Sequence, residues 1–456
     1  MGSTGGHAGT TRRASERCGD GDGVTENQDG GSQGAARAGG QDWQQWTEGV
    51  DWSDWRSWLQ RLAATDWTAF DWTSTDWTST DWTGTDRTGT DRTGTDQAQA
   101  EWAPVDWTQE QAPSTAWDQA SRGRGIPLTL RSFAENEPGD RIREHLAETW
   151  PPFRQWWRGG ANTRPTTGEA RAKLKEHMPE LIPAWQQLTA MLEDGPDGSD
   201  AGAALALWNP PPFLTGCSQA AVLPGGPALI RNYDWDHRLF DGVVARTAYT
   251  GRRVLGMLDC LWGLLDGVND AGLAVSLTFG GRPQVGEGFG IPLVIRYVLE
   301  VCGTVEEAVR VLRRVPVHMS YNVTALDRDG RRATVYLAPD RPARVTDLAV
   351  STNHQGEVEW APYVAAIRSV ERQDYLEELL AAGADAPGVV AACLRPPLYA
   401  TRFHEGFGTL YTAEYRPADG LVRYHWPDRT WEHSLDKIDP AGVQVQLGSP
   451  APAPQP

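Results

Sequence analysis

The stretch from Phe213 to Asp236, FLTGCSQAAVLPGGPALIRNYDWD, places a single cysteine between a glycine and a serine. It predicts an extended approach, a strand, a tight Pro-Gly-Gly-Pro turn and a second strand. Cysteine is an intrinsically strong nucleophile, but a nucleophile needs a base, and no histidine is well placed for that task. The α-amino group of the cysteine itself is an alternative base, because its ordinary pKa of about 7.7–8.0 lies close to working pH.

That chemistry requires Cys217 to be the first residue of a mature chain. Gly216 suits such a cut, because a glycine lets the peptide bend and offers no side chain to block attack by the thiol on its carbonyl. The other interpretation is a buried structural cysteine that follows a small residue. The Gly-Cys pair alone does not decide between the two.

The composition of the chain changes abruptly near Gly125. Residues 1–125 are rich in Gly, Ser, Thr, Asp and Gln and are predicted to form a disordered arm, because they cannot bury enough aliphatic surface to offset the entropy of ordering. A five-residue repeat over 65–97 fits no strand, helix or solenoid period. Tryptophans mark four of its units: Trp67, Trp72, Trp77 and Trp82. The repeat is either a partner-binding tryptophan array or a low-complexity expansion without a selected role.

The rest of the chain divides into three predicted parts. Residues 126–216 show apolar positions spaced by three and four, which predicts a helical N-terminal segment. Residues 217–436 alternate antiparallel hairpins with inserted helices, among them one long helix over about 363–382. Residues 437–456 are interpreted as a Pro-rich tail. This order of elements predicts an α+β fold with antiparallel sheets.

Charge and cysteine usage exclude several classes of protein. The formal net charge of the 456-residue chain is −18, which argues against a nucleic-acid partner. The five cysteines are scattered and lack C-x-x-C spacing, so neither a disulfide framework nor a zinc site is predicted. No segment has the apolar character of a signal peptide or of a membrane span. We therefore expect a cytoplasmic protein with no membrane partner.

Five motifs follow one another in a recognisable order: GCSQAAV, RNYDWD, GVNDAGLAVSLTF, STNH and ATRFHEG. Together they resemble the Ntn (N-terminal nucleophile) hydrolases, in the branch of penicillin acyltransferases and choloylglycine (bile-salt) hydrolases. The resemblance covers roughly 126–436 and implies a four-layer αββα sandwich with two antiparallel sheets. The long segment before Cys217 is similar to the penicillin acyltransferase group, whose precursor is cut into two chains that stay together.

The resemblance implies a role for each of five residues. Cys217 matches the nucleophile, and Arg231 and Asp234 match a pair beside it. Arg231 would help to hold the thiol as a thiolate, since nearby positive charge lowers the pKa of a cysteine, and Asp234 would hold the new α-amino group. Asn353 matches the side chain of the oxyanion hole, and Arg402 matches the family's second active-site arginine.

Simpler interpretations stand beside these roles. Arg231 and Asp234 would otherwise form a surface salt bridge at a strand end, worth about 0–1 kcal/mol. Asn353 would lie in an ordinary turn, and Arg402 would be one more surface arginine. Thr278 departs from the pattern, because the bile-salt branch has an asparagine there. That oxyanion contribution would then come from a main-chain N–H or from the Thr278 hydroxyl, which leaves substrate preference open.

The reaction that the resemblance implies is acyl transfer without a metal or a cofactor. A precursor would cleave itself between Gly216 and Cys217. The mature Cys217 would then take an acyl group from a small-molecule amide (a non-peptide C–N bond) or a thioester, and pass it through a thioester intermediate to water or to an amine. A plain amidohydrolase that never uses an amine acceptor is one alternative. A binding or scaffold protein that works through the tryptophan arm, with an inactive hydrolase domain, is another.

Overall fold

The computed structural model of the protein describes residues 125–158, 164–193, 200–403 and 406–448. The predicted N-terminal arm and its tryptophan repeats lie outside these residues, except for Gly125, and so does the end of the predicted tail after residue 448.

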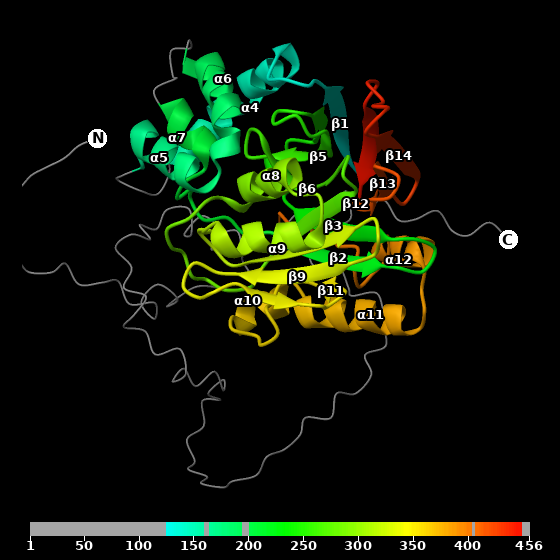
Figure 1. Ribbon diagram of the computed structural model, residues 1–456. Coiled ribbons are helices and arrows are strands. Elements are labelled where there is room, and N and C mark those ends of the chain that lie inside the picture. Colours follow the sequence, from blue (N-terminus) through cyan, green and yellow to red (C-terminus); the bar gives the residue numbers. More distant parts are fainter. Residues whose placement is uncertain (1–124, 159–163, 194–199, 404–405, 449–456) are drawn as a thin grey trace, which may run out of the picture. The chain divides into compact units, whose positions relative to one another are not determined.

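Two β-sheets form the centre of the described fold (Figure 1). The larger sheet runs in the order β10-β9-β8-β7-β6-β5-β4-β1-β15. Its strands are β1 (Ile126–Ala134), β4 (Val243–Thr247), β5 (Val254–Asp259), β6 (Gly263–Asn269), β7 (Leu273–Phe279), β8 (Tyr321–Asp327), β9 (Arg332–Leu337), β10 (Arg344–Thr346) and β15 (Val443–Leu447). The smaller sheet runs in the order β11-β2-β3-β12-β13-β14. Its strands are β2 (Gly216–Val222), β3 (Ala228–Trp235), β11 (Val350–Ser351), β12 (Gly408–Arg416), β13 (Leu421–Trp426) and β14 (Arg429–Ser434).

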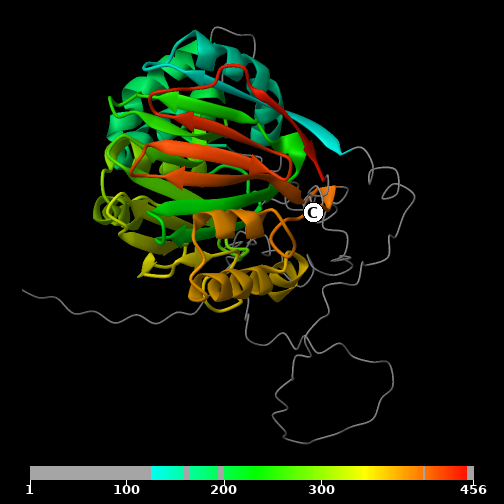
Figure 2. The same ribbon diagram turned by 90° about the vertical axis from the view of Figure 1, so that its right-hand side faces the viewer.

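Helices cover the outer faces of both sheets. The α-helices of the described ranges are α4 (Asp140–Arg158), α5 (Thr167–His177), α6 (Ile182–Glu193), α7 (Ala201–Ala206), α8 (Ile291–Val301), α9 (Val305–Arg314), α10 (Ala361–Ala366), α11 (Ser369–Ala381) and α12 (Ala386–Cys393). Helices α8 and α9 pack on the larger sheet, and α11 and α12 pack on the smaller one, below β2 and β3 in Figure 2. None of these helices combines the length and the apolar character needed to cross a bilayer.

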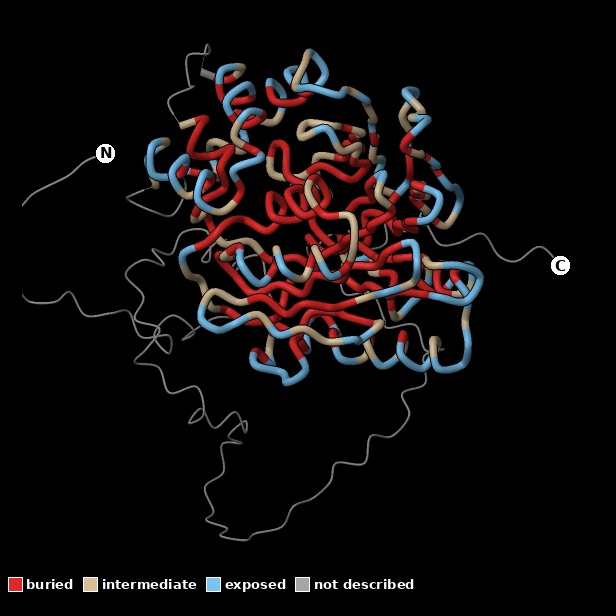
Figure 3. The backbone as a smooth tube through the Cα atoms, in the orientation of Figure 1, coloured by how far each residue is buried: buried red, intermediate tan, exposed pale blue. Residues whose placement is uncertain are grey.

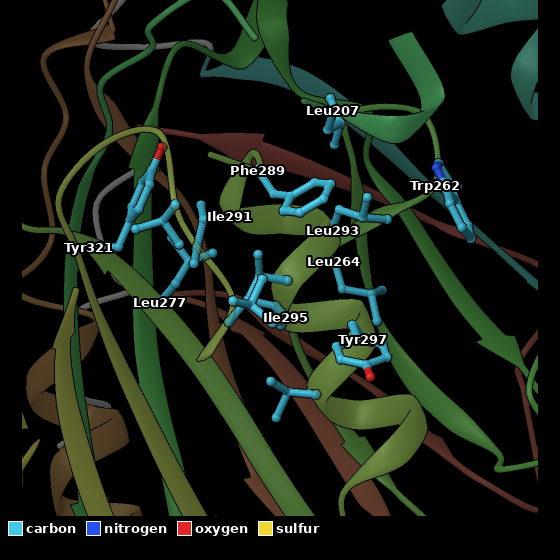
Figure 4. Packing of buried hydrophobic residues seen from close by; sticks show 14 of the residues in the cluster. Leu207, Trp262, Leu264, Leu277, Phe289, Ile291, Leu293, Ile295, Tyr297 and Tyr321 are labelled. Atoms are coloured by element: carbon cyan, nitrogen blue, oxygen red, sulfur yellow. The ribbon is translucent and has the colours of Figure 1, made fainter. Parts of the chain in front are cut away.

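The sheets face each other, with β2 and β3 against β7 and with β12 and β13 against β6. Three buried clusters fill the spaces between the layers: one under α8, one between the sheets and one under α11 and α12. Figure 4 shows Leu293 and Ile295 of α8 beside Leu264 of β6 in the first cluster. The described fold is therefore the α+β sandwich with αββα layers that the resemblance implied.

Burial follows from the position of each strand. Every residue of β2 and β3 is buried, because these strands have the other sheet on one face and helices on the other. Strands β13 and β14 instead alternate between buried and more exposed residues, as expected where one face of a sheet meets water. Figure 3 shows the same division, with central strands buried and outer helices partly exposed. The strand that carries Cys217 is thus closed off from solvent on both sides.

The structure corrects the prediction at both ends of the fold. Residues 126–134 form β1, not a helix, and β1 pairs parallel with β4, so the larger sheet is not antiparallel throughout. Residues 443–447, assigned to the tail, form β15, which pairs with β1. The sequence VQVQL alternates apolar and polar residues, which is the period of a half-buried strand. That signal was overlooked beside the prolines that follow it.

A third correction concerns the long helix predicted over about 363–382. The segment forms two helices, α10 and α11, because Arg368 between them adopts a left-handed backbone conformation with φ of 55°. The break redirects the chain, so that Tyr363 of α10 and Arg372 of α11 both reach residues around Cys217.

Replacement of Leu447 tests whether β15 is an integral strand. Leu447 is 1% exposed and packs in the cluster between the sheets, so Leu447→Ala should lower the free energy of unfolding by about 2–5 kcal/mol. Gln446 points the other way on the same strand and is exposed, so Gln446→Ala should change it by less than about 0.5 kcal/mol. Urea denaturation of the full chain measures both. Equal midpoints for the two variants would show that β15 does not dock.

Candidate active site

Cys217 lies near the start of β2, fully buried, with its side chain in the cluster between the two sheets. Its partner across the ladder to β3 is Tyr233, which belongs to the same cluster. The residue before it, Gly216, pairs with Asp234. The register of the β2–β3 hairpin therefore places the Gly-Cys pair directly beside the RNYD motif, as the spacing in the sequence suggested.

Gly216 is needed for a reason that the sequence did not show. A Cβ atom built on Gly216 would lie 2.3 Å from Cε2 of Phe407 and 3.3 Å from Cβ of Asp234. Contacts below about 3.0 Å essentially never occur for real Cβ atoms, so any larger residue would have to displace the Phe407 ring. Glycine thus lets the Phe407 ring approach the bond between residues 216 and 217.

Arg231 connects the thiol to the opposite sheet. Its Nη2 donates to Sγ of Cys217 at 3.0 Å, and its Nη1 forms an ion pair with Oδ2 of Asp266 at 2.8 Å. Asp266, on β6, also accepts hydrogen bonds from the hydroxyls of Tyr411, at 2.6 Å, and Tyr415. All of these groups are buried. The alternative of an exposed salt bridge at a strand end is therefore wrong for Arg231.

The electrostatic balance at the thiol has two opposing parts. Burial raises the pKa of Cys217 above its ordinary value, and the positive charge of Arg231 acts in the opposite direction. In the continuous chain burial has the larger effect, so the expected net lowering of this pKa is not seen. Arg231 is nevertheless the first of the neighbours that favour the thiolate.

Asp234 approaches Cys217 from the other face of β3. Side chains alternate along a strand, so a spacing of three residues puts Arg231 and Asp234 on opposite faces. Oδ1 of Asp234 accepts from the hydroxyl of Thr409 at 2.7 Å, and Oδ2 lies 3.6 Å from Nη1 of Arg372. No described residue donates a hydrogen bond to that Oδ2, although it is buried. Burial raises the pKa of Asp234, and the charge of Arg372 opposes this effect.

Arg372 is a site residue that the sequence reasoning missed. It extends from α11, and its Nη1 donates to the carbonyl of Cys217 at 2.6 Å and to Oγ of Ser218 at 2.7 Å. Its Nη2 donates to Oδ1 of Asn353 at 2.8 Å. One buried guanidinium thus joins the nucleophile strand to Asp234 and to Asn353. Nothing in SVERQDYLEELLA separates this arginine from a surface arginine of an ordinary helix.

Asn353 contacts the backbone on both sides of Gly216. Its Oδ1 accepts from the N–H of Cys217 at 2.9 Å, and its Nδ2 donates to the carbonyls of Phe279 at 3.0 Å and Thr215 at 3.4 Å. The hydroxyl of Tyr363, another residue that was missed, donates to the same Thr215 carbonyl at 2.7 Å. Asn353 is fully buried and lies inside the site, not in an exposed turn.

Thr278 lies behind Asn353. Its hydroxyl donates to the carbonyl of Thr352 at 2.5 Å and accepts from Nδ2 of Asn322 at 3.1 Å. Asn322 also donates to the carbonyls of Thr352 and His354. These contacts hold the segment that carries Asn353. They also engage the Thr278 hydroxyl that we considered as an oxyanion donor.

Arg402 lies at the margin of the site. Its Nη2 donates to the carbonyl of Ala366 at 2.8 Å, and its guanidinium lies 5.0 Å from the centre of the Phe407 ring. Its positive charge is one of those that oppose the rise in the pKa of Asp234 caused by burial. Cys217, Arg231, Asp234 and Asn353 form the centre of the site. Arg402 lies outside this centre, beside Phe407, whose ring covers Gly216.

A cavity of about 320 Å³ adjoins this centre and shares Tyr233 with it. Aromatic side chains from several elements line it: Phe153, Trp156, Phe213, Tyr233, Trp235 and Phe240. In the described ranges no group of three or more His, Cys, Asp or Glu side chains is arranged to hold a metal ion.

Comparison with known proteins connects this geometry to a family. Residues 223–431 match the profile of the family described as acyl-coenzyme A:6-aminopenicillanic acid acyl-transferase. The matched residues include Arg231, Asp234, Asn353 and Arg402, and they begin six positions after Cys217. No curated protein sequence matches the chain.

Three of the solved structures that match the chain come from three different organisms. The N-acylethanolamine-hydrolyzing acid amidase ortholog of Caenorhabditis elegans is 17% identical, covering 44% of this chain and 93% of its own, with a TM-score of 0.35. Penicillin V acylase of Agrobacterium tumefaciens is 16% identical, covering 52% and 92%, with a TM-score of 0.35. A mutant of the conjugated bile acid hydrolase of Clostridium perfringens is 14% identical, covering 51% and 96%, with a TM-score of 0.31.

The described fold should depend strongly on the Arg231–Asp266 pair. Asp266→Asn leaves a buried guanidinium without its counter-charge, so the free energy of unfolding should fall by about 3–5 kcal/mol. Asp270, four residues further on, forms partly exposed ion pairs with Arg252 and Arg253, and Asp270→Asn should cost no more than about 1 kcal/mol. Chemical denaturation of both variants measures the difference. A cost for Asp266→Asn as small as that for Asp270→Asn would show that Asp266 does not compensate the charge of Arg231.

Proposed function

We propose that the protein is an autoproteolytic Ntn hydrolase that uses Cys217 to cleave or transfer the acyl group of a small-molecule amide or thioester. The observation that carries this proposal is the set of contacts on Cys217 itself. Arg231 donates to its Sγ, Asn353 accepts from its N–H, and Arg372 donates to its carbonyl. Any buried cysteine needs partners for its backbone N–H and carbonyl, but a structural cysteine does not need a buried guanidinium against its Sγ.

The first reaction in this proposal is self-cleavage. The Cys217 thiol loses its proton and attacks the carbonyl carbon of Gly216, the C–N bond between the two residues breaks, and the nitrogen takes up a proton to become an amine. Water then hydrolyses the resulting thioester, which frees the thiol and leaves a carboxylate on Gly216. The hydrogen bonds from Tyr363 and Asn353 to the Thr215 carbonyl support this step, because they fix the chain next to the bond that is attacked.

The second reaction is turnover by the mature chain. The free α-amino group of Cys217 would act as the base, and the unsatisfied Oδ2 of Asp234 is a buried acceptor that could orient it. Arg231 would stabilise the thiolate, and Nδ2 of Asn353 would donate to the oxyanion of the tetrahedral intermediate. The acyl group then leaves the thioester for water or for an amine.

We further propose that the two pieces, 126–216 and the chain from Cys217, remain one unit. Strand β1 of the first piece lies between β4 and β15 of the second. Trp262 of the second piece donates from Nε1 to the carbonyl of Leu205 in the first at 2.8 Å. A scaffold protein with an inactive domain is the alternative, but it would not need a buried guanidinium against the Cys217 thiol.

Self-cleavage gives the most direct test. The purified protein should yield a fragment that begins at Cys217, by intact mass and by N-terminal sequencing, and the two fragments should co-elute in native size exclusion. Cys217→Ala should remain uncut, because alanine has no thiol to attack the Gly216 carbonyl. Cys302→Ala, at another buried cysteine, should be cut normally. Normal processing of Cys217→Ala would assign the cut to an external protease.

The roles of Asp234 and Asn353 are tested on protein that has been cut, made from co-expressed halves where a variant does not cut itself. Asp234→Asn should lower kcat/KM by about 10²-fold through loss of orientation of the amine. Asn353→Ala should lower kcat by about 10²–10³-fold with little change in KM, because an oxyanion donor acts in the transition state. Asp236→Asn, which loosens Arg238 and the neighbouring His237, should behave like wild type. Near-normal activity of both site variants, with a panel of acyl amides, would remove them from the site.

A further inference from the structure

The cavity beside Cys217 has a definite entrance and floor. Leu239, at 61% exposed, and Arg238 lie on its rim, whereas Tyr233, at 2% exposed, forms part of its floor. Tyr233 pairs with Cys217 across the β2–β3 ladder, so this one residue separates the cavity from the nucleophile, which does not itself line the cavity. Phe153, Trp156 and Phe213 bring walls from the segment before the proposed cut.

Three carboxylates line this aromatic cavity: Glu148, which is paired with Arg131, and Asp241 and Asp259. Oδ1 of Asp259 accepts the N–H of Cys260 at 2.8 Å. Oδ2 of Asp241 is buried, and no described residue donates a hydrogen bond to it. Nε2 of His145 lies 3.9 Å from it. Burial lowers the pKa of His145 to about 4, so this ring is neutral at pH 7 and does not compensate the carboxylate.

The other cations near the cavity are already paired. Arg131, whose charge reaches Asp241, forms an ion pair with Glu148 at 2.5 Å. Arg238, on the rim, is held by both carboxylate oxygens of Asp236. Asp259 has Arg231 as its charged neighbour, and that guanidinium is bound to Asp266. Asp241 and Asp259 therefore lack a counter-cation of their own among the described residues.

The titration of the pair follows from this shortage of positive charge. Burial raises the pKa of Asp259 to about 7, against the opposing effects of the Cys260 N–H and of Arg231. Burial and the charge of Asp259 raise the pKa of Asp241 well above its ordinary value, and Arg131 opposes this. A cation in the cavity would favour the ionised form of both groups and would lower both pKa values.

The turn that carries Asp259 into the cavity is strained. Cys260 and Leu261, both on the cavity wall, have φ angles of 51° and 74°, in a region that residues other than glycine rarely adopt. Such strain is retained where the surrounding structure fixes it, and it is frequent at ligand sites. Here the strained turn places Asp259, at the end of β5, and the two residues after it on the cavity wall.

We propose that this cavity binds a substituted ammonium group, carried by the substrate whose acyl carbonyl is attacked by Cys217. Aromatic faces attract such cations through their electron-rich surfaces, and Asp241 and Asp259 supply the opposite charge. This inference rests on the proposed function and specifies its substrate class as amides or thioesters that bear a cationic amine.

The test uses choline and its uncharged isostere 3,3-dimethylbutan-1-ol as probes, with titration calorimetry on the full chain. Choline should bind about 10-fold tighter or more, because the two probes differ only in the charged atom. The charge of choline does not titrate, so its affinity should rise with pH through about 7, as Asp259 ionises. Asp259→Asn should lower the preference and remove this rise, and the double replacement of Asp241 and Asp259 by Asn should bring the two affinities close together.

Glu144→Gln is the matched control, because Glu144 is an exposed carboxylate that pairs with Arg141 and does not line the cavity, and it should bind choline like wild type. Asn retains an acceptor for the Cys260 N–H, and an unchanged thermal midpoint would confirm that Asp259→Asn folds. Equal affinity for the two probes, or an Asp259→Asn variant that keeps the full preference, would overturn the inference. Self-cleavage and hydrolysis of neutral amides without choline binding would leave the proposed function intact, whereas choline binding by an uncut, inactive chain would refute the function instead.

Discussion

A single buried guanidinium, that of Arg231, ties the thiol to the rest of the structure. A charge enclosed between two sheets is costly unless it is paired and hydrogen-bonded, and its partner, Asp266, comes from the opposite sheet. The hydroxyls of Tyr411 and Tyr415 on β12 donate hydrogen bonds to the same carboxylate. The contact between Arg231 and Cys217 therefore exists only when the sandwich is closed. Folding and assembly of the site are in this sense one event.

The strand β3 distributes its polar residues over two faces. Arg231 enters the space between the sheets, whereas Asp234 faces the helical layer, where Arg372 and Thr409 meet it. Arg372 then continues to Asn353 and to the Cys217 carbonyl. Cys217 is held through its thiol from one side and through its backbone from the other. This division separates the group that contacts the sulfur from the groups that contact the backbone of Cys217.

Cys217, Arg231 and Asp234 lie on one hairpin, where register and alternation convert spacing directly into proximity, whereas Asn353 was named only through the family resemblance. The motifs could not reveal Asp266 or Arg372, which reach the site from another sheet and from a helix, where only tertiary packing separates a buried charge from an exposed one. The same limit applies to β1, whose nine residues became a strand through pairing with β4 and β15. Strand β15 differs, since its alternation was readable in the sequence.

The position of β1 has a consequence for the life of the protein after the proposed cut. Strand β1 lies between two strands that belong to the other piece, so the pieces are interleaved and not merely docked. Before the cut, refolding is a unimolecular search within one chain. Afterwards it becomes an encounter between two chains and depends on their concentration. The mature protein would then persist because it unfolds slowly, and its lifetime, not its equilibrium stability, would be the quantity under selection.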